Sequence, residues 1–249
     1  MRLDKFLCDA HIGTRKDVKK LIKEGKISVD GEVAKNFDMK IDEEKSIVTL
    51  NGEKIIYEKF VYFMMNKPKG YISATEDKYK NTVLNLLPEE FMYYNLFPAG
   101  RLDVDTEGFL LLTDDGVFAH NILSPKKHVS KTYFALIDGR VKDEHIKLFE
   151  DGITLDDGYK TLPSKLKILK SGDTSEIELT IYEGKFHQVK RMFEAIGTSV
   201  TYLKRIAMGN LFLDETLKKG EIKKLSKDDI LKIESDRYKG EWKWTLLKL

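Results

Sequence analysis

The 249-residue sequence is poor in cysteine and proline and has no long apolar run. Its single cysteine, Cys8, excludes an intrachain disulfide and the paired-cysteine spacing of a structural zinc site. No stretch approaches the ~20 apolar residues of a membrane-spanning helix, and residues 1–25 carry charges throughout, unlike a signal peptide. We therefore expect a cytoplasmic protein that has no membrane partner.

The charges of the chain almost cancel. Lysine and arginine together number 43 against 41 aspartates and glutamates, a formal net charge of +2 that argues neither for nor against a nucleic-acid partner. An apolar fraction of 41% and a charged fraction of 34% are ordinary for a globular protein and exclude collagen-like and wholly disordered chains. The length predicts either one large domain or a large domain with a small appendage.

The N-terminal segment has the pattern of a small α/β module. Residues 3–10 place apolar side chains on one helical face, and Thr14 is positioned to cap a second helix that Gly25 ends. Two hairpins are then predicted at the turn dipeptides Asp30-Gly31 and Asn51-Gly52. A module of this size, roughly sixty residues, folds alone only marginally.

The second helix presents a strongly basic face. The residues predicted to point outward are Arg15, Lys16, Lys19, Lys20 and Lys23. Such a face can follow a phosphate backbone and release its counterions, but a solvated surface without a ligand gives the same pattern. The residues alone leave both interpretations open.

The rest of the chain predicts a larger domain of mixed α and β structure, starting at residue 59. Strand-like segments alternate with loops, and a helix is predicted over residues 187–197, ending at Gly197. We place the start of the linker at Asp42–Lys45 and set the domains at residues 1–58 and 59–249.

The densest group of charged residues is the segment PAGRLDVDTEGFLLLTDDG, residues 98–116. Its acidic spacing approaches a calcium-binding loop, but the preceding Pro98 and Gly100 do not fit the entering helix of an EF-hand. A purely structural turn is the stronger alternative. The functional interpretation is that Asp103, with Arg101 nearby, is a carboxylate suited to attack an electron-poor sugar carbon.

Four motifs in order carry a resemblance to a known family. The segment GRLDVDTEGFLLLTDDG resembles the catalytic motif of the pseudouridine synthases of the small-subunit ribosomal RNA (RsuA) type. NKPKGYIS, SKTYFALIDG and EGKFHQVKRMFEAIG resemble the flanking motifs, and residues 2–33 resemble the S4 RNA-binding domain. The resemblance implies an α+β fold in which an S4 domain precedes a mixed, largely antiparallel sheet domain.

The resemblance also implies the site and its chemistry. Uridine is isomerised to its C-glycoside without a cofactor or a metal, and the target base leaves its stack. Asp103 corresponds to the catalytic aspartate, Tyr133 to the tyrosine that stacks on the base, and Lys190 to the basic residue paired with the aspartate. Arg101 corresponds to the arginine near the flipped nucleotide, and Leu203 to the pocket wall.

Several further residues are placed with less support from the motifs. Arg191, adjacent to Lys190 on the predicted helix, is included as a substrate-binding residue together with the basic residues of the second helix. His187 is left out of the catalytic set. The aspartates Asp105, Asp114 and Asp115 are interpreted as loop-shaping residues that accept backbone hydrogen bonds.

The sequence leaves three functional hypotheses. The first is a monomeric pseudouridine synthase whose partner is ribosomal RNA, with the 16S species as the main target and the 23S species as the alternative. The second is a non-catalytic S4-type RNA-binding or ribosome-assembly factor. The third, calcium-dependent binding, rests on the acidic spacing alone.

Overall fold

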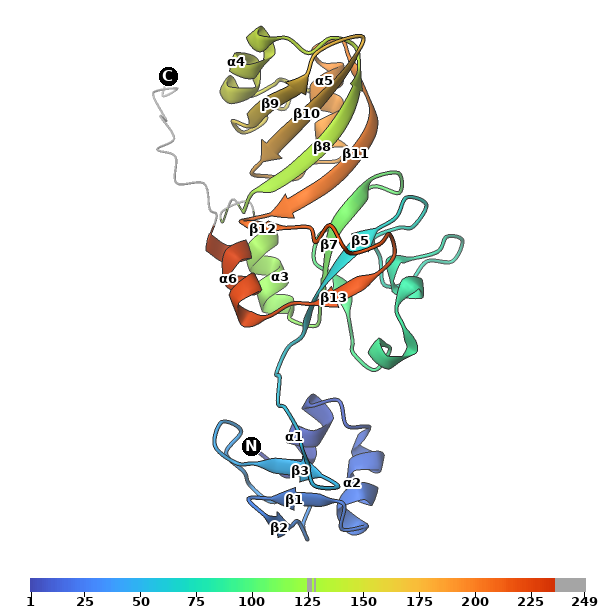
Figure 1. Ribbon diagram of the computed structural model, residues 1–249, viewed down its shortest axis with the longest axis vertical. Coiled ribbons are helices and arrows are strands. Elements are labelled where there is room, and N and C mark those ends of the chain that lie inside the picture. Colours follow the sequence, from blue (N-terminus) through green and yellow to red (C-terminus); the bar gives the residue numbers. More distant parts are fainter. Residues whose placement is uncertain (125–126, 128, 236–249) are drawn as a thin grey trace. The chain divides into compact units, whose positions relative to one another are not determined.

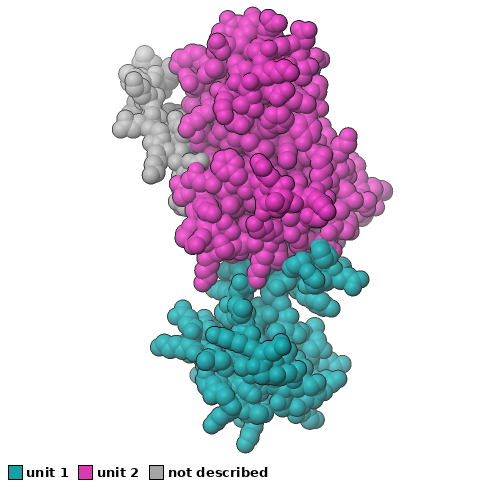
Figure 2. Space-filling view, in the orientation of Figure 1, with its two compact units in different colours: residues 1–61, 88–95 teal, residues 62–87, 96–249 magenta. Residues whose placement is uncertain are grey.

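The computed structural model describes residues 1–124, 127 and 129–235. The chain divides into two compact units (Figure 2). Unit 1 comprises residues 1–61 and 88–95, and unit 2 comprises residues 62–87 and the chain from residue 96 onward. Across the described residues, no helix combines the length and apolar character that crossing a membrane requires.

Unit 1 has the predicted arrangement of two helices followed by two hairpins (Figure 1). Helix α1 spans Leu3–Asp9, and α2 spans Arg15–Lys23. The side chain of Thr14 accepts a hydrogen bond from the Asp17 backbone N–H, and the Asp17 carboxylate accepts one from the Thr14 N–H. This reciprocal cap satisfies two of the free amides at the helix start and confirms the predicted capping residue.

The hairpins of unit 1 form one four-stranded sheet in the order β2-β1-β3-β4. The strands are β1 (Ile27–Val29), β2 (Glu32–Val33), β3 (Val48–Leu50) and β4 (Glu53–Lys54). Both turns occur at the predicted dipeptides, where Asp30 and Asn51 have positive φ angles. Apolar side chains of α1, α2, β1 and β3 pack into one core under this sheet.

Unit 2 is built on a nine-stranded sheet. Its path runs β13-β5-β7-β11-β8-β10-β9, and every neighbouring pair on it is antiparallel except β7 and β11. The strands are β5 (Tyr62–Lys67), β6 (Phe97–Pro98), β7 (Glu107–Thr113), β8 (Lys131–Asp138), β9 (Lys165–Lys170), β10 (Thr174–Ile181), β11 (Ser199–Met208), β12 (Leu211–Phe212) and β13 (Ile222–Lys224). The predicted α+β class with a largely antiparallel sheet is therefore confirmed.

Helices complete unit 2. They are α3 (Gly116–Leu123), α4 (Asp143–Asp151), α5 (Gln188–Glu194), α6 (Lys227–Ser235) and the short 3-10 turn η1 (Val83–Leu86); a second such turn, η2 (Glu89–Phe91), lies in the segment assigned to unit 1. Helices α3 and α6 pack their apolar side chains against β5, β7 and β12. Helix α5 was predicted, whereas α3 and α4 were not.

One glycine fixes the parallel junction between β7 and β11. Gly108 pairs with Arg205, and its φ of +98° lies in the left-handed region that favours glycine. A side-chain carbon at this position would overlap the backbone carbonyl of Arg205. The close approach holds the start of β7, and with it the acidic loop before it, against the middle of the sheet.

Candidate active site

A cavity of about 830 Å³ opens in unit 2 beside the acidic loop. Its wall is formed by residues 72–74, residues 100–106, strands β8 and β11, and the segment that enters α5. Five residues predicted from the sequence line it together, namely Arg101, Asp103, Tyr133, Lys190 and Leu203. Chain positions more than 100 residues apart therefore meet at one site.

Asp103 lies between two basic side chains. The Lys190 ammonium nitrogen is 3.6 Å from one carboxylate oxygen, and the His187 Nε2 is 3.7 Å from the other. The Asp103 side chain keeps 31% of its surface exposed, so a ligand in the cavity can reach it. His187, which the sequence analysis left out of the catalytic set, is thus a neighbour of the predicted catalytic carboxylate.

Lys190 binds a second carboxylate more closely than the first. Its ammonium donates to both oxygens of Asp105, at 2.7 and 2.8 Å. Partial burial alone would raise the pKa of Asp105, but the hydrogen bonds and charge of Lys190 outweigh it and leave that pKa below its ordinary value. Asp105 therefore holds the Lys190 ammonium beside Asp103, a role that the sequence analysis did not give it.

Lys67 fastens the acidic loop from beneath. Its side chain is fully buried at the end of β5, and its ammonium donates to the backbone carbonyls of Pro68, Asp103 and Thr106 at 3.1, 3.1 and 2.9 Å. Burial lowers the pKa of Lys67 to about 8, against the opposing charges of the nearby carboxylates. The sequence signal for this residue was a lysine at the end of the strand-like segment YFMMNK.

A serine fixes the other side of the same loop. The Ser73 hydroxyl donates to the carbonyl of Leu102 and accepts from its N–H, both at 3.0 Å. These bonds hold the residue before Asp103, and Lys67 holds the Asp103 carbonyl, so two side chains fix the backbone of the catalytic candidate. Fixed positioning of this kind is what a reacting carboxylate requires.

The floor of the cavity is one face of the sheet. Tyr133 and Lys131 alternate with outward residues along β8, and Leu203 and Arg205 do so along β11. Tyr133 is 8% exposed and Leu203 is 6% exposed, so both reach the cavity from buried positions. Burial and the charge of Arg205 lower the pKa of Lys131 to about 8. On this floor the ring of Tyr133 and the apolar side chain of Leu203 offer a surface that fits a planar base.

The two predicted arginines differ in their surroundings. Arg101 is exposed at the rim of the cavity. The Arg191 guanidinium instead binds Asp156 and Asp157 and is not among the residues that line the cavity. Adjacent residues on a helix point about 100° apart, which is why Lys190 faces the cavity and Arg191 does not.

The acidic loop has none of the helical surroundings of a calcium loop. It is entered from β6 and continues directly into β7, all of whose residues are buried. Asp115 caps α3 by accepting from the Phe118 N–H, as expected of a loop-shaping aspartate.

The basic residues of α2 are exposed, as predicted. Val18 and Ile22 are buried in the core of unit 1, while the outward residues are Arg15, Lys16, Lys19, Lys20 and Lys23. The Lys19 ammonium lies 4.3 Å from the centre of the Phe37 ring. This face of α2 is available to a phosphate backbone.

Comparison with known proteins agrees with this arrangement. The model of the family described as RNA pseudouridylate synthase matches residues 61–195, and that of the S4 domain matches residues 1–47. The "Uncharacterized RNA pseudouridine synthase YtzG" of Bacillus subtilis is 48% identical, covering 92% of this chain and 97% of its own. The "Ribosomal small subunit pseudouridine synthase A" of Vibrio cholerae is 42% identical, covering 94% and 99%.

A solved structure gives the same result for the fold. A crystal structure described as a pseudouridylate synthase is 37% identical and aligns with a TM-score of 0.66, covering 94% of this chain and 99% of its own. The chain belongs to the RNA pseudouridylate synthase family. Within it, the chain is of the type that carries an N-terminal S4 domain, and it is an RNA-modifying isomerase.

Proposed function

We propose that this protein isomerises a specific uridine of small-subunit ribosomal RNA to pseudouridine, with Asp103 as the catalytic residue. The observation that carries the proposal is the position of the Asp103 carboxylate, between Lys190 and His187 and in the same cavity as Tyr133. The relative from Vibrio cholerae, which is named for the small ribosomal subunit, supports the 16S species as the target. The 23S species is the alternative.

The proposed reaction conserves atoms and uses no cofactor. The bond from C1′ to N1 of the uridine breaks with assistance from the Asp103 carboxylate, and the electron pair stays on the uracil ring. The ring turns in the cavity, a new bond joins C5 to C1′, C5 loses its proton and N1 gains one. Asp103 acts either by attack at C1′ or as a base, and Lys190 stabilises its charge in both cases.

The base must leave its stack to reach this cavity. Unstacking costs a few kcal/mol, which contacts inside the site must offset. Tyr133 and Leu203 supply an aromatic and an apolar surface for the extruded uracil. Arg101, at the rim of the cavity, fills space beside the extruded nucleotide. Enclosure of the uracil by these side chains would supply that offset.

The two units divide the work in this proposal. Residues 1–58 bind structured RNA through the basic face of α2, and residues 59–249 carry the chemistry. The protein acts as a cytoplasmic monomer on the RNA. The separate core of unit 1, with its cations on the outside, supports this division.

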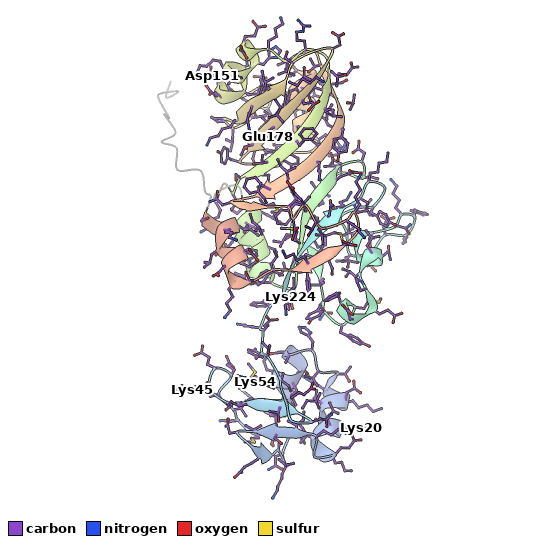
Figure 3. All side chains as sticks on the ribbon, in the orientation of Figure 1. Lys20, Lys45, Lys54, Asp151, Glu178 and Lys224 are labelled. Carbon is purple, nitrogen blue, oxygen red and sulfur yellow. The ribbon has the colours of Figure 1, made fainter. Side chains whose placement is uncertain are left out.

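Tritium release from ribosomal RNA labelled at uridine C5 tests the activity. We expect Asp103→Asn to lower the rate by at least ~10²–10⁴-fold, because the reacting carboxylate is lost. Asp151→Asn is the matched control, since Asp151 is an exposed carboxylate on α4 outside the cavity lining (Figure 3). Activity that survives Asp103→Asn would refute its role, and binding without turnover in the parent chain would favour an assembly factor.

Mapping of pseudouridine in a strain that lacks the protein identifies the target. We expect one uridine of the 16S RNA to remain unmodified. Loss of a site in the 23S RNA instead would keep the chemistry and overturn the choice of substrate.

A further inference from the structure

The segment between β10 and α5 displays an aromatic ring at the rim of the active-site cavity. Phe186 lines the cavity, and yet 71% of its surface is exposed. Exposure alone is common, since Phe212 is 66% exposed elsewhere on unit 2, but Phe186 combines its exposure with a place on the lining of the cavity. We propose that the Phe186 ring is a stacking platform for the nucleobase adjacent to the target uridine. This inference rests on the proposed function.

The turn that carries Phe186 is fastened from below. Gln188 is buried, and its amide oxygen accepts from the Lys185 N–H at 2.9 Å while its amide nitrogen donates to Glu183 at 3.0 Å. The backbone N–H of Gln188 donates back to the Lys185 carbonyl at 3.2 Å. Phe186 therefore stands on a preorganised turn, which lowers the entropy cost of binding a base.

The platform is coupled to the catalytic residue through one ring. The Phe186 and His187 rings are stacked, with centroids 3.8 Å apart and an interplanar angle of 18°. His187 has a positive φ of 48°, and its Nε2 lies 3.7 Å from Asp103. A base stacked on Phe186 would therefore lie close to the uridine on which Asp103 acts.

Base extrusion creates the need for such a surface. When the target uridine enters the cavity, its neighbour in the strand loses a stacking partner. A side chain with an open aromatic face replaces that partner without regard to base identity, a contact worth ~1–3 kcal/mol per base. The Phe186 ring contacts His187 and Phe186 keeps 71% of its surface exposed, so the ring has surface left for a base.

The charges around the platform favour RNA over a protein partner. Lys185 is exposed at the rim and lies 4.4 Å from the centre of the Tyr159 ring, and Arg101 also lines the rim. Cations interleaved with an aromatic ring along a groove are the pattern that binds a single-stranded nucleic acid. The occupant is therefore a short single-stranded segment of RNA that flanks the target.

The test compares two exposed phenylalanines of unit 2. Phe186→Ala removes the platform, and Phe212→Ala is the matched control, since Phe212 is 66% exposed on β12 and does not line the cavity. We expect Phe186→Ala to raise KM for small-subunit RNA by about 5- to 150-fold, the loss of one stacked base, with kcat within about twofold. Phe186→Tyr should restore KM, and Phe212→Ala should leave it unchanged.

A second measurement separates this proposal from the proposed function. Anisotropy of a labelled oligouridylate, measured with the Asp103→Asn chain, reports binding without turnover. Weaker binding on adding Phe186→Ala supports the platform even if the parent chain fails to form pseudouridine. Equal KM and equal oligouridylate affinity for Phe186→Ala and Phe212→Ala would overturn it, and a matched thermal melting temperature shows that both variants fold.

Discussion

The two units of this protein use their cations in opposite ways. In unit 1 the basic residues of α2 all lie on the outside of the helix, where water and salt screen them. Among the described residues of unit 2, three cations are almost fully buried at the cavity or beneath its acidic loop, namely Lys67, Lys131 and Arg205. An exposed cation is free to meet a diffusing phosphate, whereas a buried one is committed to the protein groups around it.

This contrast separates recognition from positioning. The exposed cations of α2 attract phosphate groups, and this attraction depends strongly on ionic strength and little on geometry. Each buried cation fixes backbone around the site: Lys67 bonds the carbonyls of Asp103 and Thr106, Lys131 that of Val129, and Arg205 that of Phe109. Variants that disturb the buried cations of unit 2 should therefore change stability and activity together. Variants of the exposed cations of α2 should change only RNA binding.

The largest effect is expected from Gly108→Ala. The new side chain combines a strained φ with overlap on the Arg205 carbonyl, which we expect to lower the free energy of unfolding of unit 2 by about 4 kcal/mol. Gly158→Ala is the control, because φ is +81° there but nothing lies within 4 Å, so only about 1 kcal/mol is lost. Hydrogen exchange measures the stability of each unit separately. Equal loss of protection in residues 1–47 would contradict the independence of the units.

Lys67→Met should have the next largest effect. It leaves buried carbonyls of the acidic loop without a donor, at a cost of about 2–3 kcal/mol in the free energy of unfolding. Displacement of Asp103 should lower the rate of pseudouridine formation by about 10²-fold. Denaturant titration and tritium release measure the two effects. Lys69→Met, at an exposed position two residues on, should change neither.

The pH dependence of stability tests the burial of Lys131. Its pKa is about 8 in the folded chain and near the ordinary 10.5 in the unfolded chain, so the unfolded chain binds more protons between these values. The free energy of unfolding therefore rises with pH in this window. We expect Lys131→Met to lower that rise by about 1–2 kcal/mol between pH 8 and 9.5. Lys165→Met, at an exposed position on β9, should leave the rise as in the parent chain.

The smallest effect on stability is expected for substitutions of the exposed cations of α2. Lys16→Gln with Lys23→Gln should leave the free energy of unfolding within ~0.5 kcal/mol. The slope of log K for RNA binding against log salt concentration is negative, and its magnitude should decrease by about 1.4–1.8. The control pair is Lys45→Gln with Lys54→Gln, which lie off α2 (Figure 3). An equal fall in the control slope would show that the attraction is spread over unit 1 and is not confined to α2.

The same contrast explains what the sequence could predict. Thr14 as the cap of α2 and the turns at Asp30-Gly31 and Asn51-Gly52 depend on neighbours within a few residues, so local patterns sufficed. The basic face of α2 follows from helical periodicity alone. In unit 2, the resemblance carried by four ordered motifs predicted five residues that line the cavity, while Arg191 was wrongly placed among the residues facing the substrate.

The contacts inside the cavity were beyond local patterns. Lys190 meets Asp105 at a separation of 85 residues, and neither charge alone specifies the other as its partner. In the sequence, Lys67 is an ordinary polar residue at the end of a predicted strand. Only the fold shows that backbone carbonyls surround its ammonium. The diversion of Arg191 to Asp156 depends in the same way on a loop that precedes β9.

The strand order of unit 2 also determines when its sheet can be completed during synthesis of the chain. Strand β5 pairs with β13, which leaves the ribosome roughly 150 residues later. At about 5–20 residues per second, one edge of β5 waits about 8–30 s for its partner. Such an edge attracts other strands, so this nascent chain needs protection during synthesis, and a chain truncated before residue 222 should aggregate.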